Sequence, residues 1–91
     1  METKIRNVIL DVASKPGVTG VLIADQNGLC LGSKGSIDSS VSGSLVHLMQ
    51  LAKKLEPTKS PILKLEADIS SIIIKSDDKI TLALAMNQKK H

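Results

Sequence analysis

The side chains that most often carry out chemistry are few in this chain, and they are spread widely. The two histidines, His47 and His91, and the single cysteine, Cys30, lie far apart in the sequence. None of them stands at the short spacing with which cysteine and histidine bind zinc. We therefore expect no catalytic residue, no metal site and no cofactor. His47 is interpreted as an ordinary helix residue and Cys30 as an inert, packed thiol.

One glycine-rich segment suggests a phosphate-binding loop at first sight. Its order, Gly32-Ser33-Lys34-Gly35, lacks the glycine-lysine-serine sequence that opens a helix directly after a strand. The carboxylates also have simple structural interpretations, because Asp25 and Asp77 stand at predicted turns and Asp38 before a predicted helix. The sequence therefore predicts a protein that is not an enzyme.

The composition describes one small domain, predicted to span residues 1–91. Hydrophobic residues make up 42% of the chain, yet phenylalanine, tyrosine and tryptophan are absent, so aliphatic side chains must build the core. The net charge of +3 comes from scattered lysines with Arg6 as the only arginine, and bases would find no aromatic side chain to stack on. We expect no nucleic-acid partner. Because so short a chain buries little surface, association with a partner would add stability.

The location that the sequence predicts is cytoplasmic. A lone cysteine suits a reducing compartment, and no apolar run approaches the length of a membrane span. The first residues show no secretory signal, and Glu2 stands where a myristoylation signal would need glycine. We expect no direct membrane insertion, so any membrane location would depend on a partner.

The hydrophobic patterns predict an α+β fold with the order α-β-β-α-β-β-β. Helices are predicted at residues 3–14 and 39–55, and strands at 18–26, 29–33 or 34, 62–67, 70 or 71–76, and 80–86. Asn27-Gly28 predicts a tight hairpin turn, and Pro57 should end the second helix. We expect a five-stranded antiparallel sheet with both helices packed on one shared face, and a frayed tail at 87–91.

The second predicted helix has an unusual surface. Helical periodicity predicts that one apolar stripe faces the sheet, consisting of Val41, Leu45, Leu48, Ala52 and Leu55. The rest of the helix from Ser39 to Gln50 then lacks charged residues, apart from the neutral His47, although a water-exposed face usually carries them. Two interpretations stay open, a weakly polar solvated face or a partner interface formed by Ser39, Ser42, Gly43, Val46, Met49 and Gln50.

The strand at 62–67 adds Leu63 and Leu65 to this predicted interface. If it lies at the sheet edge, its backbone is free to pair with a strand of another chain. Its charged residues, Lys64 and Glu66, have an alternative use in protecting that edge against such pairing.

Specific residues together resemble the roadblock/dynein light chain family, and within it the small subunits of the lysosomal Ragulator adaptor. The similarity runs through Gly20-Val21-Leu22, Asp25-Gln26-Asn27-Gly28-Leu29, Leu31-Gly32, Lys34-Gly35, Gly43, Ala52-Lys53-Lys54-Leu55, Leu65-Glu66-Ala67-Asp68 and Ile72-Ile73-Ile74. It covers essentially the whole chain and relies on the order and spacing of these segments.

The resemblance implies a non-catalytic scaffold subunit that forms a heterodimer with another roadblock-like subunit. It also implies membership of a larger complex that contains a lipid-anchored subunit, binds Rag GTPases at the cytosolic face of late endosomes and lysosomes, and serves amino-acid signalling to target of rapamycin complex 1. Two alternatives stay open, a homodimeric light chain and a direct regulator of small GTPases, although Arg6 is a poor candidate for an inserted catalytic group.

Overall fold

The computed structural model describes residues 3–55, 62–77 and 79–87. The elements are α1 (Thr3–Ala13), β1 (Val18–Asp25), β2 (Cys30–Gly35), a 3₁₀ turn η1 (Ser39–Val41), α2 (Ser42–Leu55), β3 (Ile62–Glu66), β4 (Ser70–Ser76) and β5 (Ile80–Asn87). The predicted element order is confirmed, and most bounds differ by no more than two residues, but the first three residues of the second predicted helix form the 3₁₀ turn η1. Asn87 ends β5 and donates its amide to the carbonyl of Gly17 at 2.9 Å. Residues 88–91 of the predicted tail and the predicted stop at Pro57 lie outside the described residues.

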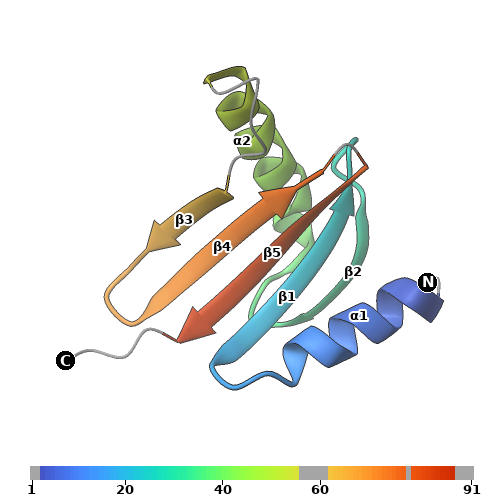
Figure 1. Ribbon diagram of the computed structural model, residues 1–91, viewed down its shortest axis with the longest axis vertical. Helices are drawn as coiled ribbons and strands as arrows, with labels where there is room; N and C mark the ends of the chain where they lie inside the picture. Colours follow the sequence, from blue (N-terminus) through green and yellow to red (C-terminus); the bar gives the residue numbers. More distant parts are fainter. Residues whose placement is uncertain (1–2, 56–61, 78, 88–91) are drawn as a thin grey trace.

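The predicted five-stranded antiparallel sheet is confirmed, and its strands lie in the order β2-β1-β5-β4-β3. The hairpin β1–β2 lies at one side, the meander β3–β4–β5 at the other, and β1 and β5 join them (Figure 1). This order places β3 at one edge of the sheet and β2 at the other.

The turn between β1 and β2 is organised by Asp25. Its carboxylate accepts hydrogen bonds from the amides of Asn27 at 2.9 Å and Leu29 at 3.0 Å. The amide of Gly28 donates to the carbonyl of Asp25, and Gly28 alone in the turn takes a positive φ, of 87°. The predicted hairpin is confirmed, but its turn is longer than the two-residue form that Asn27-Gly28 suggests.

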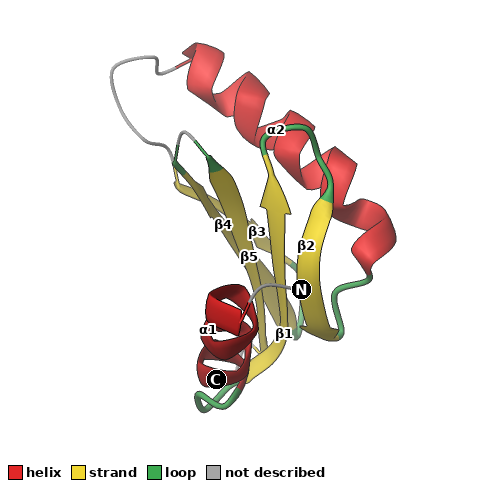
Figure 2. Ribbon diagram, turned by 90° about the vertical axis from the view of Figure 1, so that its right-hand side faces the viewer, coloured by secondary structure: helices red, strands yellow, loops and turns green. Residues whose placement is uncertain are grey.

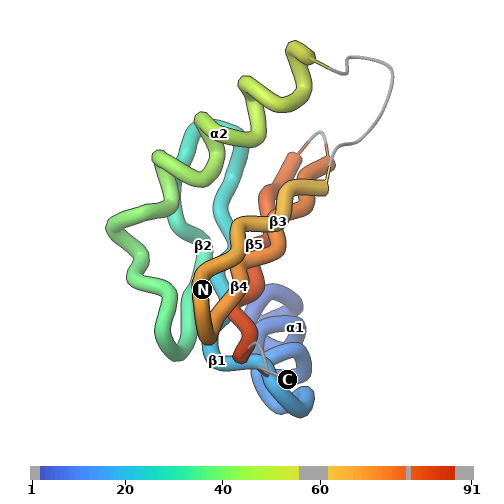
Figure 3. Tube along the Cα trace, turned by 90° about the vertical axis from the view of Figure 1, so that its left-hand side faces the viewer, coloured from blue at the N-terminus to red at the C-terminus, as the bar shows by residue number. Residues whose placement is uncertain are grey.

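The two helices pack on opposite faces of the sheet, and the expectation of a shared face is wrong (Figures 2 and 3). Neighbouring residues of β1 point to opposite faces, so Leu22 and Ala24 join the core under α2 while Val21 and Ile23 join the core under α1. The physical reason lies in β1 itself. A strand that is buried on both faces needs a cover on both, and α1 and α2 provide one each.

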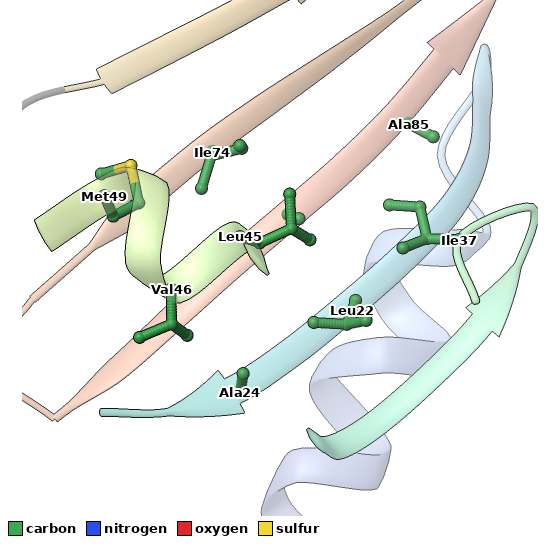
Figure 4. Close-up of a cluster of buried hydrophobic side chains, with 9 residues drawn as sticks. Leu22, Ala24, Ile37, Leu45, Val46, Met49, Ile74 and Ala85 are labelled. Atoms are coloured by element: carbon green, nitrogen blue, oxygen red, sulfur yellow. The ribbon is translucent and has the colours of Figure 1, made fainter. Parts of the chain in front are cut away.

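The main core lies between α2 and the sheet, and Figure 4 shows its side chains converging from the helix, from the sheet and from the segment before the helix. Leu45, Val46 and Met49 of α2 are buried there. The other members of this cluster come from the sheet and from the segment before α2: Leu22, Ala24, Ile37, Ile74, Ala83 and Ala85. The cluster contains no aromatic side chain, as the composition requires.

Candidate partner interface

The orientation of α2 differs from the sequence-based expectation. Ser42, Leu45, Val46 and Met49 are the buried residues of this helix, at the spacing i, i+3, i+4, i+7. Val41 and Leu55, which we expected to face the sheet, are exposed, and Leu48 and Ala52 are only half-buried. The three predicted interface residues Ser42, Val46 and Met49 are therefore buried within the chain itself.

The hairpin turn β1–β2 explains this orientation. The hydroxyl of Ser42 donates to the carbonyl of Gly28 at 2.6 Å, and the side-chain amide of Gln50 (Nε2) donates to the backbone carbonyl of Gln26 at 3.3 Å. A Cβ atom added to Gly28 would come within 3.0 Å of the Cα of Gly43. Ser42, Gly43 and Gln50 thus lie toward the hairpin, and a small helix surface there lets the turn approach closely.

The helix flank that points away from the hairpin is apolar. Val41 reaches the groove beside β4 and β5, and Leu48 packs against the main core, as Leu63 and Ile72 also do. Farther along the helix, Leu51 is 44% exposed and Leu55 is 84% exposed. The stripe that we expected beneath the helix is therefore largely on its side, where it faces the open edge of the sheet.

The edge strand β3 continues this apolar surface. Leu63 packs against the core under α2, and Leu65, two residues on, points to the same face and is 46% exposed. Lys64 and Glu66 point to the opposite face, where their side chains form an exposed ion pair with an Nζ–Oε1 distance of 3.0 Å. The charges of β3 thus leave its α2 side apolar. We call the following residues the pairing face: Val41, Leu48, Leu51 and Leu55 of α2, Leu63 and Leu65 of β3, and Ile72 of β4.

A groove of about 580 Å³ opens on the α2 side of the sheet, near the start of α2. Ile37, Val41, Ile72 and Ala85 form its apolar walls. Its polar lining consists of Thr19, Ser36, Asp38, Ser70, Ser71 and Asn87. The carboxylate of Asp38 accepts a hydrogen bond from the amide of Ser40 at 2.8 Å, and this bond lowers the pKa of Asp38. The groove therefore combines an apolar floor with a negative charge at its rim.

Two more predicted interface residues, Ser39 and Gly43, are exposed at the surface. Ser39 is exposed in η1, which begins after Asp38, the predicted cap. Gly43 is exposed, and a Cβ atom added to it would meet no atom within 4 Å, although its Cα lies next to the hairpin turn. The apolar surface of α2 and the sheet also includes residues that the sequence interpretation did not assign to a partner: Val41, Leu48, Leu51, Leu55 and Ile72. Their apolar character was visible, but the side of the helix on which they lie depends on a long-range contact with Gly28.

The groups that could do chemistry are not brought together. His47 is exposed on α2, whereas Cys30 is half-buried in β2 and packs against the main core. Gly32 to Gly35 all lie within β2 rather than before a helix. Within residues 3–55, 62–77 and 79–87, no three histidine, cysteine or acidic side chains are close enough to hold a metal ion. Neither helix of the described part is long and apolar enough to cross a membrane.

Solved structures with the same fold include two bacterial proteins. Myxococcus xanthus MglB superposes with a TM-score of 0.80 at 20% identity, covering 98% of this chain and 80% of that one. A roadblock/LC7 domain from Streptomyces avermitilis superposes with a TM-score of 0.74 at 13% identity, covering 92% of this chain and 75% of that one. These similarities show that the chain has the roadblock fold.

The family follows from the sequence comparisons. Ragulator complex protein LAMTOR5 of Xenopus laevis is 35% identical over 86 residues, and the homologue of Nematostella vectensis is 36% identical over the same length. Each alignment covers 92% of this chain and 94% of the relative. The family model described as Ragulator complex protein LAMTOR5 matches residues 1–86. The chain therefore belongs to the Ragulator complex protein LAMTOR5 family, whose members are scaffold subunits with the roadblock fold rather than enzymes.

Proposed function

We propose that this chain forms a heterodimer with another roadblock-like subunit of Ragulator, through the pairing face and the free edge of β3. The assembled complex, with its lipid-anchored subunit, would hold Rag GTPases at the cytosolic face of late endosomes and lysosomes for amino-acid signalling to target of rapamycin complex 1. The observation that carries the proposal is an apolar surface continuous from α2 to the edge strand. Membership of a family named for a complex supports it.

The exposed leucines make this surface costly to leave in water. Leu51 and Leu55 of α2 and Leu65 of β3 are between 44% and 84% exposed. Burying apolar surface stabilises a complex by roughly 25 cal/mol per Å² before the costs of association are subtracted. A contiguous apolar patch on a small protein is typical of a protein–protein contact. The pairing face is therefore the surface best suited to bury a partner.

The unpaired edge of β3 would orient the partner, because backbone hydrogen bonds fix the direction of an added strand. In the described part of the sheet, β3 pairs with β4 alone, so its other side presents backbone amides and carbonyls in a row. A strand of a second roadblock domain can add there and extend the sheet, while apolar residues above it join the two helices. The ion pair of Lys64 and Glu66 lies on the other face and leaves this pairing possible.

The experiment is to mix the purified chain with candidate roadblock subunits of Ragulator and to measure the mass of the complexes by light scattering after size exclusion. We expect a one-to-one complex. Leu65→Asp or Leu51→Asp should abolish it, because each places a charge in the buried contact. A chain that forms no complex with any roadblock subunit would contradict the proposal.

A matched control separates loss of the interface from loss of the fold. Leu10 on α1 is exposed to the same extent as Leu51, at 44%, but it lies on the opposite side of the sheet. Leu10→Asp should leave the complex intact. If it disrupts the complex as strongly as Leu51→Asp does, the interface is not on the α2 side.

The cellular setting needs a second measurement. A tagged chain should co-localise with a lysosomal marker, and Leu65→Asp should make it diffuse in the cytoplasm, because its location would come from the partner. Lysosomal retention of a variant that no longer binds the roadblock subunit would show that recruitment uses a different surface.

A further inference from the structure

The β1–β2 turn carries a reactive dipeptide that the proposed function does not use. Asn27 is exposed, and the residue after it, Gly28, has no side chain that would shield its backbone nitrogen. Attack of this nitrogen on the side-chain carbonyl carbon (Cγ) of Asn27 closes a succinimide ring, which is the first step of spontaneous deamidation. The turn therefore contains both groups that the reaction needs.

The fold requires glycine at position 28. Its φ is 87°, a conformation that other residues rarely adopt, and an added Cβ atom would lie 3.0 Å from the Cα of Gly43. The contact between the turn and α2 therefore keeps the neighbour of Asn27 small. Asn7 offers a contrast within the same chain, because it lies in α1 and is followed by Val8, whose branched side chain crowds the attacking amide.

Hydrogen bonds restrain the reactive nitrogen while the turn is folded. The amide of Gly28 donates to the carbonyl of Asp25 at 3.0 Å. The carboxylate of Asp25 accepts from the amides of Asn27 at 2.9 Å and Leu29 at 3.0 Å, which fixes the backbone on both sides of Gly28. The nitrogen must lose its proton before it attacks, and its hydrogen bond holds that proton in place. The turn must therefore open locally before the ring can close.

Asn27 lies between the two backbone carbonyls that hold α2. The carbonyl of Gly28 accepts from the hydroxyl of Ser42 at 2.6 Å, and that of Gln26 accepts from the side-chain amide of Gln50 at 3.3 Å. A change in the length of the backbone at Asn27 would move one of these carbonyls relative to the other. A modification at this position would therefore act on the attachment of the helix.

We propose that Asn27 is a site of spontaneous deamidation that is gated by opening of the β1–β2 turn, and that its isoaspartate product releases α2 from the hairpin. The backbone nitrogen of Gly28 gives up its proton and bonds to Cγ of Asn27. The bond between Cγ and the side-chain nitrogen breaks, and this nitrogen leaves as ammonia with the proton. The inference goes beyond the proposed function and does not depend on it.

One water molecule then opens the succinimide in one of two ways. Cleavage between Cγ and the nitrogen of Gly28 gives aspartate and restores the ordinary backbone. Cleavage between the backbone carbonyl carbon and that nitrogen gives isoaspartate, in which the main chain runs through Cβ and Cγ and is longer by a methylene group. The isoaspartate form is the one that cannot keep both carbonyls in place.

The experiment follows Asn27 in the full chain at mildly alkaline pH, with peptide mass spectrometry to measure conversion of the amide to the acid. We expect conversion to be at least about tenfold slower in native buffer than in concentrated urea. Asp25→Ala and Ser42→Ala loosen the turn from its two sides, so each should speed the native reaction about threefold or more. Neither should change the rate in urea. Asn7 is the internal control and should not respond.

Ile9→Ala is the matched control for the gate. It removes buried surface on the α1 side of the sheet, away from the turn, so the native rate at Asn27 should stay unchanged. If Ile9→Ala speeds the reaction as strongly as Ser42→Ala does, the reaction proceeds through global unfolding and gating by the turn is overturned. Equal rates in native buffer and in urea would overturn the gate as well. An absence of conversion in native Asp25→Ala would overturn the site itself.

The effect of the product is measured on the isoaspartate form, separated from an aged sample by chromatography. Asn27→Asp carries the same new charge on an ordinary backbone and should unfold at nearly the same urea concentration as the unaltered chain. The isoaspartate form should unfold at a lower concentration, and the amides of Ser42–Leu55 should exchange hydrogen faster in it. Equal exchange in the two proteins would overturn the release of α2. All of these measurements use the chain without a partner, so their failure leaves the proposed heterodimer untouched.

Discussion

An amphipathic helix covers each face of the sheet, but the two helices differ in how many residues they bury and in how they are tied to the strands. On the α2 side, nine buried residues from the sheet, the helix and Ile37 form one cluster, and two hydrogen bonds tie the helix to the β1–β2 turn. On the α1 side, Ile9 is the only buried residue of the helix, and it meets Val21 and Ile23 within a ring of half-buried aliphatic residues. The chain concentrates its close packing on one face.

The difference shows how a small chain without aromatic residues can be stable and still offer a binding surface. The α2 side holds its helix firmly by the hairpin flank, so the opposite flank can stay exposed without the helix losing its position. The α1 side has no comparable polar connection among the hydrogen bonds of the described residues. We therefore expect core substitutions on the α2 side to lower the free energy of unfolding more than those on the α1 side. We also expect substitutions on the α1 side to leave the pairing face unaffected.

The largest effect should come from truncating the main core. Leu22 is fully buried under α2, and Leu22→Ala should lower the free energy of unfolding by about 3–5 kcal/mol, because the close packing around it cannot collapse into the cavity. Ile9→Ala on the α1 side should cost only about 2–3 kcal/mol, since its half-buried neighbours can move inward. Urea unfolding followed by circular dichroism measures both. Equal losses would contradict the contrast between the faces.

The two glycines at the contact of the hairpin with α2 should respond in opposite directions. Gly28→Ala should lower the free energy of unfolding by about 1–3 kcal/mol, because φ is 87° and a Cβ atom would press on Gly43. Gly43→Ala should raise it by up to about 1 kcal/mol, because a Cβ atom there has open space and alanine favours the helix.

The same pair also tests the position of the interface. Gly43 was one of the predicted partner contacts, but it lies on the hairpin side of α2. Gly43→Ala should therefore leave the affinity for a roadblock subunit unchanged when measured by isothermal titration calorimetry. Loss of affinity without loss of stability would return the interface to the hairpin side of the helix.

Removing the hydrogen bond between Ser42 and the hairpin should have an intermediate effect on the free energy of unfolding. Ser42→Ala should lower the free energy of unfolding by about 1–2 kcal/mol, because Ser42 is buried and the carbonyl of Gly28 loses its 2.6 Å donor. Gln50→Ala removes a longer, exposed bond and should cost about 0.5 kcal/mol or less. Thermal unfolding ranks the two. A larger loss for Gln50→Ala would mean that the hairpin is held mainly from the middle of the helix.

Local patterns were sufficient to predict most of the fold. Asp25 to Gly28 predicts the hairpin, Asp38 predicts the start of the second helical segment, and alternating residues in 80–86 predict the last strand. Each of these signals acts over a few residues, so it can be read without knowledge of the tertiary structure. The run Val21-Leu22-Ile23-Ala24 also contained the information that both faces are covered, since all four residues are buried.

The rotation of α2 could not be predicted in the same way. The predicted stripe places Leu45 correctly in the core, but the centre of the buried surface is shifted toward Ser42, Val46 and Met49. What decides this shift is Ser42, whose hydroxyl bonds to a carbonyl 14 residues away. A polar residue in a helix is expected to be exposed until its partner is known, so the sequence alone could not predict that Ser42 is buried.

The smallest effect concerns the pH dependence of stability. It compares Asp38, before the α2 segment, with Asp77, in the β4–β5 turn. The amide of Ser40 bonds to Asp38, and the amides of Ile80 and Lys79 bond to Asp77, which lowers the pKa of both carboxyl groups. A carboxyl whose pKa is lower in the folded state stabilises the fold above its unfolded pKa of about 3.9, and this contribution is lost as pH falls through the folded value.

Asp77→Asn and Asp38→Asn keep an acceptor at each position but remove its titration. Measured by urea unfolding between pH 2 and pH 7, the loss of stability below about pH 4 should be shallower in each variant than in the unaltered chain. The three acid slopes compare the two sites directly, since the amides of Ile80 and Lys79 lower the pKa of Asp77 and the amide and hydroxyl of Ser40 lower that of Asp38. If stability falls equally steeply with pH in all three proteins, neither carboxylate stabilises the fold through its charge. A shallower slope for Asp38→Asn would mean that the acid sensitivity of the fold lies at the groove end of α2.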